Sequence, residues 1–149
     1  MALRDGDFKK LKPEIQATVV EYTNALDAWE RTLTVAVKEI GTCCAKFMSA
    51  QGPNTPVTGD VNCAFMDAST NVGKSREKLE AQKKFLTHFK THPVGHEYGR
   101  LCDDCSFFLS GASLRNAIAA SSAQSVQEIS AKFQRTVAEN IEWIGKQPK

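Results

Sequence analysis

The sequence of 149 residues lacks an excess of either charge: 19 lysine and arginine residues face 17 aspartate and glutamate residues, a formal charge of +2. This excludes a general polyanion-binding role, which requires a strong basic excess. No apolar run approaches the roughly 18 residues needed to cross a bilayer, and residues 1–12 lack the apolar centre of a secretory signal. We therefore expect a soluble, cytoplasmic protein that forms a single domain over residues 1–149.

Cysteine and proline are scarce. Five cysteines, an odd number with Cys43 and Cys44 adjacent, make a poor disulfide framework and predict reduced thiols. Prolines interrupt the interior of the chain in only two places, QGPNTPVTGD at residues 51–60 and THPVG at residues 91–95. The sequence also lacks a catalytic set, a phosphate-binding loop and a cofactor motif, so we expect no enzymatic activity, no cofactor, no small-molecule substrate and no nucleic-acid partner.

Apolar residues instead recur at alternating spacings of four and three residues. In the first third of the chain they are Ile15, Val19, Tyr22, Leu26, Trp29, Leu33, Ala36, Ile40, Cys43 and Phe47. The same spacing returns from Val61 to Phe89, where Ser75 and Gln82 place polar groups on the seam. A seven-residue period sustained this long indicates long helices that pack against other helices, and polar seam residues often fix the register.

We therefore predict an all-α, coiled-coil-like antiparallel bundle of three long helices, at about residues 14–50, 60–92 and 96–146. The third helix has an alternative. Its middle is rich in Ala and Ser, and Ser125 with Glu128 forms a capping box, which favours a break near residues 111–125 and a four-helix bundle. The high alanine content favours one continuous helix, which is the version we adopt.

A continuous third helix of this length would project beyond the loop at residues 51–60. Large apolar side chains on a projecting segment indicate an interaction surface, so we predict a homodimer. The predicted dimer seam consists of Phe133, Val137, Ile141, Trp143 and Ile144. In the four-helix alternative these residues are covered within one chain.

Two clusters suggest further sites. His88 and His92 are one helical turn apart, and Cys102 and Cys105 are three residues apart, which are spacings that zinc ligands use. Because Cys105 also fits a core position, we commit to no metal site and keep zinc as an alternative. The predicted second helix is basic, and cations on such a helix can contact anionic lipid. The candidates for lipid contact are Lys74, Arg76, Lys78, Lys83, Lys84 and Lys90.

The segment Tyr22–Ile40 (YTNALDAWERTLTVAVKEI), together with the three predicted helices and the basic second helix, resembles the BAR and arfaptin-homology class. That resemblance implies a non-enzymatic scaffold whose dimers bind curved anionic membranes, with peripheral membrane association. The alternative is a coiled-coil module for protein–protein interaction, spectrin-like or a four-helix bundle, that binds a partner through its exposed seam and has no lipid role.

Overall fold

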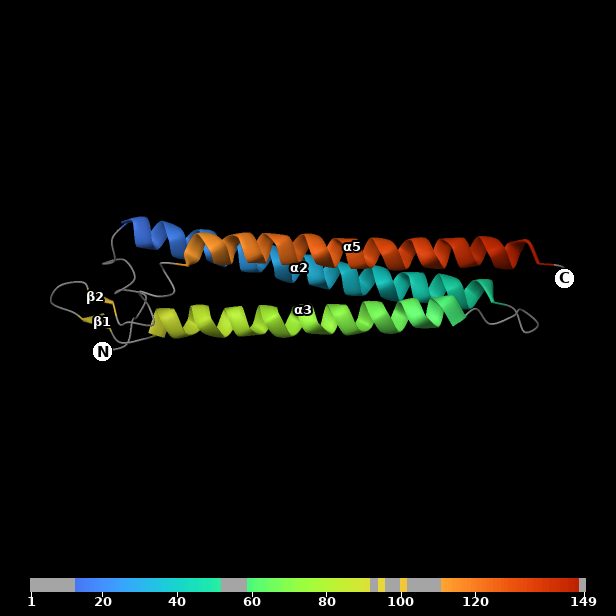
Figure 1. Cartoon of the computed structure of the whole chain (residues 1–149), viewed down its shortest axis with the longest axis horizontal. Helices are drawn as coiled ribbons and strands as arrows, with labels where there is room; N and C mark the ends of the chain where they lie inside the picture. Colours follow the sequence, from blue (N-terminus) through green and yellow to red (C-terminus); the bar gives the residue numbers. More distant parts are fainter. Residues whose placement is uncertain (1–12, 52–58, 92–93, 96–99, 102–110, 148–149) are drawn as a thin grey trace. The chain divides into compact units, whose positions relative to one another are not determined.

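The computed structural model describes residues 13–51, 59–91, 94–95, 100–101 and 111–147. Three helices dominate this part of the chain (Figure 1): α2 spans Pro13–Ala50, α3 spans Gly59–Thr91 and α5 spans Ala112–Gly145. The predicted all-α class is confirmed. The bounds of α2 and α3 lie within one residue of those predicted, because the apolar period and the proline-containing segments mark helix ends locally.

The third helix begins later than predicted. Strand β1 (Val94–Gly95) pairs with strand β2 (Arg100–Leu101) in an antiparallel arrangement, with Val94 opposite Leu101 and Gly95 opposite Arg100. Residues 100–101 therefore cannot belong to a helix that starts at 96, and this part of the prediction was wrong. Helix α5 starts after Gly111, whose carbonyl accepts the first helical hydrogen bond from the Arg115 amide at 2.9 Å.

Helix α5 runs without a break through residues 121–125, so the continuous form is the correct one for Ala112–Gly145. The capping box at Ser125 and Glu128 does not start a new helix, because the alanines around it favour continuation. The helix ends in tighter i to i+3 hydrogen bonds, from the Lys146 amide to the Trp143 carbonyl and from the Gln147 amide to the Ile144 carbonyl, each 3.1 Å long.

The chain divides into two compact units, and each contains a segment of all three helices. The first unit comprises Met1–Glu30 and Glu77–Ser122, and the second comprises Arg31–Arg76 and Ala123–Lys149. The core of the first unit contains Val19, Tyr22, Leu26, Trp29, Leu79, Leu86, Ala112 and Ala119. The core of the second contains Leu33, Ala36, Ile40, Phe47, Val61, Ala68, Val72, Val126, Phe133 and Val137.

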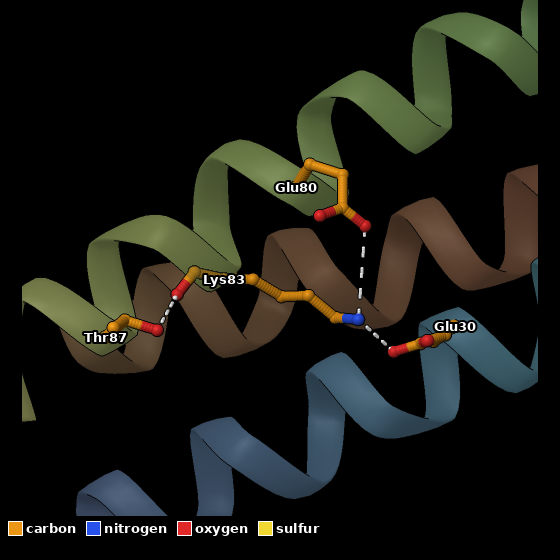
Figure 2. Close-up of polar contacts among 4 residues, drawn as sticks. All are labelled: Glu30, Glu80, Lys83 and Thr87. Carbon is orange, nitrogen blue, oxygen red and sulfur yellow. Dashed lines mark hydrogen bonds and ion pairs between the residues drawn. The ribbon is translucent and has the colours of Figure 1, made fainter.

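Polar contacts join the helices of the first unit. The Tyr22 hydroxyl donates a hydrogen bond to Gln82 Oε1, which links α2 to α3. Lys83 forms an ion pair with Glu30 of α2, and its amine lies 4.0 Å from a Glu80 carboxylate oxygen (Figure 2). The hydrogen bond with Glu30 raises the pKa of the Lys83 amine. Gln82, a polar residue of the second predicted seam, thus has a specific hydrogen-bond partner, Tyr22, on the neighbouring helix α2.

The second unit has its own polar link between helices. Ser130 of α5 is buried and donates a hydrogen bond of 2.7 Å to Oε2 of Glu39 on α2. Gln134 donates to the same carboxylate oxygen at 2.9 Å. On the α3 side, the rings of Phe65 and Phe133 pack with centroids 6.2 Å apart at an interplanar angle of 59°. A buried polar group with its hydrogen bond satisfied specifies which helix faces meet.

Candidate interaction surface

A groove lies between helices α3 and α5 of the second unit, and we call it the α3–α5 groove. Its volume is about 300 Å³. It is lined by Ala64, Asp67, Ala68 and Asn71 of α3 and by Ser125, Glu128, Ile129, Lys132 and Phe133 of α5. On each helix the lining residues recur at spacings of three and four. Their side chains therefore lie on the edge of that helix that borders the groove.

The most buried lining residues of the groove are apolar. Ala68 and Phe133 are buried, and Ala64 and Ile129 are half-buried. The two alanines are one helical turn apart on α3, so no long side chain fills the space above them. This explains why a groove exists here: α3 presents small residues where α5 presents Ile129 and Phe133.

The outer residues of the groove are polar and carry both signs of charge. Asp67, Ser125, Glu128 and Lys132 are exposed. Asn71 donates a hydrogen bond of 3.2 Å to Asp67 Oδ1 on its own helix. An apolar floor between polar edges is the arrangement with which an amphipathic helix is bound in a groove.

The predicted dimer seam is only partly exposed. Phe133 and Val137 are 1% and 2% exposed within a single chain, so the prediction that they project without a partner was wrong. The projection was inferred from a third helix much longer than the second, but α5 with 34 residues is about as long as α3 with 33. Ile141 and Ile144 are half-buried, whereas Trp143 is 41% exposed.

The basic side chains of α3 do not form one stripe. Lys74, Arg76, Lys78 and Lys84 are exposed, and Lys83 is half-buried in its ion pair with Glu30. Lys74 and Lys78 share a side of the helix, but Arg76 points about 160° away from Lys74 at 100° per residue. The side chain of Lys90 lies outside the described residues. The lipid-contact prediction therefore applies best to the pair Lys74 and Lys78.

The predicted zinc ligands lie outside the part of the structure that can be tested. His88 belongs to α3, but its side chain is not described, and His92, Cys102 and Cys105 lie outside the described residues. Among the side chains that are described, no three histidine, cysteine or carboxylate residues are placed to hold a metal ion. Cys43, Cys44 and Cys63 are free thiols, and burial, with a smaller effect of adjacent Cys43, raises the pKa of the Cys44 thiol.

The groove could not be predicted from the sequence, because most of its edge residues resemble an ordinary solvated helix face. Asp67 and Asn71 carry no motif, Glu128 belongs only to the capping box with Ser125, and Ala64 and Ala68 fit a plain helix. The one available signal was Ile129, an apolar residue that lies one helical turn from Ser125 and from Phe133. Only the pairing of α3 with α5 brings the two edges together.

No helix among the described residues has an apolar stretch long enough to span a membrane. Comparison of the chain with protein-family models, with curated proteins and with solved structures gave no significant match.

Proposed function

We propose that the protein is a non-enzymatic helical interaction module that binds an amphipathic helix in the α3–α5 groove. The groove itself is the observation that carries this proposal: an apolar floor that includes Ala68, Ile129 and Phe133, bordered by exposed polar residues of both charges. A helix seated there would complete a local four-helix packing, in which its apolar side chains cover the floor and its polar flanks meet the edges.

The size of the groove supports a helix more than a metabolite. A volume of about 300 Å³ is at the lower limit of small-molecule pockets. It suits the few apolar side chains that one face of a helix inserts at spacings of three and four residues.

Site-specific photo-crosslinking tests this proposal. A photoreactive residue at Ser125, which lines the groove, is expected to cross-link to a helical segment of the binding partner in cells, and sequencing of the cross-linked peptide identifies that segment. The matched control is the same residue at Ala131, which is exposed on α5 about 120° away around the helix. Equal yields at the two positions would contradict binding in the groove.

Filling the groove provides a second readout. Replacement of half-buried Ala64 with tryptophan is expected to occupy the floor and abolish the Ser125 cross-link, whereas Ala131→Trp, on the exposed surface outside the groove, is expected to leave it unchanged. Circular dichroism of both variants verifies that they remain helical. A cross-link that survives Ala64→Trp would place the partner elsewhere.

We also propose, as a second candidate, contact with anionic membranes through Lys74 and Lys78. This candidate rests on their exposure and shared helix side, because adjacent cations each contribute about 1 kcal/mol near an anionic surface. Acidic Glu77 lies between them in the sequence and is also exposed, so the expected binding is weaker than for an uninterrupted basic face.

A further inference from the structure

We infer that the helix bound in the α3–α5 groove is α5 of a second copy of this chain, antiparallel to the first α5 in a two-fold symmetric dimer. This inference rests on the proposed function and names its partner. The argument comes from the charges at the groove, where Glu128 and Lys132 lie one helical turn apart on the same edge of α5 and both are exposed.

A two-fold axis near residue 130 makes this edge complementary to itself. In an antiparallel pair about this axis, each residue lies level with a residue of the other helix, and the two residue numbers add up to about 260. Glu128 of each copy then lies beside Lys132 of the other, which gives two identical ion pairs, as an isologous interface requires. A parallel two-fold pair would place Glu128 beside Glu128 and Lys132 beside Lys132, and these like charges would repel.

The other groove residues fit the same register. The Ile129 side chains of the two copies come within about 3 Å of each other along the helix axis, because they are offset by only two residues at 1.5 Å each. Asp67 on the opposite edge offers a second carboxylate to the incoming Lys132. The small side chains of Ala64 and Ala68 leave room for the second helix to approach α3. In the described part of the chain, the Lys132 amine has no ion-pair partner.

Charge reversal separates this arrangement from other modes of association. Sedimentation velocity of the full chain is expected to show a dimer, and E128K or K132E is expected to weaken it by about tenfold or more, because each substitution converts both ion pairs into like-charge contacts. The double variant E128K/K132E restores both ion pairs, now with the lysine at position 128 and the glutamate at position 132, and is expected to dimerise like the wild type. Both positions are exposed, so the fold is expected to be retained.

Mixing the two single variants gives the decisive result. An E128K chain carries lysine at both positions and a K132E chain carries glutamate at both, so the two are expected to form a mixed dimer although neither pairs with itself. A wild-type chain that stays monomeric, or single variants that dimerise like the wild type, would overturn the inference.

Failure of this inference differs from failure of the proposed function. If the wild-type chain is monomeric and the Ser125 cross-link joins a helix of another protein, the groove binds a helix but not this chain. If Ser125 and Ala131 cross-link equally, the groove does not bind a helix at all. A Ser125 cross-link to the α5 segment of a second copy supports both statements.

Discussion

Tyr22 of α2 donates a hydrogen bond from its phenolic hydroxyl to Oε1 of Gln82 on α3, across a sequence separation of 60 residues. Tyr22 is fully buried, whereas Gln82 is half-buried. The hydrogen bond therefore sets the register between two helices of the first unit, since sliding one helix by a turn would leave polar groups of both residues without this partner.

Removal of the Tyr22 hydroxyl is expected to destabilise the protein. Tyr22→Phe should lower the free energy of unfolding by about 1–2 kcal/mol, because the Gln82 amide then loses its partner. Urea denaturation monitored by circular dichroism measures the loss. Replacement of Gln127, an exposed glutamine of α5, with leucine serves as the control and should cost less than about 0.5 kcal/mol. A Tyr22→Phe variant as stable as the wild type would show that the hydrogen bond does not hold the register.

Stability should also fall in alkaline solution because of Tyr22. Burial raises its pKa from 10.0 to about 12, and the smaller effect of the Arg115 charge acts in the opposite direction. Between these two pH values the unfolded chain loses the phenolic proton while the folded chain keeps it, so the contribution of Tyr22 to stability is present below pH 10 and is lost as the pH rises towards 12. The loss is on the order of 2 kcal/mol.

Comparison with Tyr22→Phe isolates this effect from the lysines that titrate in the same range. Unfolding free energies measured at pH 9 and above should fall more steeply for the wild type than for the variant. Parallel curves for the two proteins would contradict a raised pKa at Tyr22.

The ion pair between Lys83 and Glu30 should contribute little to stability. Its side chains are 32% and 51% exposed, and exposed pairs contribute about 0.2–1 kcal/mol. A double-mutant cycle with Lys83→Met and Glu30→Gln is expected to give a coupling energy in this range that shrinks in high salt. A coupling above about 2 kcal/mol that salt does not change would mean that the pair is effectively shielded from solvent.

Phe133 should behave as a core residue and Trp143 as a surface residue, although both were predicted on one dimer seam. Phe133→Ala is expected to cost about 3–5 kcal/mol because it removes a buried ring that packs on Phe65. Trp143 is 41% exposed, so Trp143→Ala is expected to lower the free energy of unfolding by less than about 2 kcal/mol. Thermal unfolding of the two variants measures the contrast, and equal losses would contradict the assignment.

Membrane binding should depend on position as well as charge. If the second candidate function holds, K74E/K78E is expected to reduce sedimentation with phosphatidylserine vesicles by about tenfold or more, and salt should weaken the wild-type interaction. K38E/K46E changes the net charge equally at two exposed lysines of α2 and should have a smaller effect. An equal effect of both variants would indicate nonspecific attraction, and no vesicle binding by the wild type would remove the candidate.

The sequence by itself determined helices α2 and α3 and much of the core, because both follow from local periodicity. Every described side chain of the first predicted seam except Cys43 is buried, from Val19 to Phe47. The bounds of α2 and α3 were predictable for the same reason: proline and glycine act on the backbone within a few residues.

Only the tertiary structure decided the features that depend on pairing between distant segments. Arg100–Leu101 pairs with Val94–Gly95, α5 begins at Ala112, and Phe133 lies in the core where it packs on Phe65. The groove and the partner of Gln82 likewise depend on which helix faces meet. The helical period shows on which side of its helix each residue lies. It does not show which other helix that side packs against, because this depends on the summed packing of all three helices.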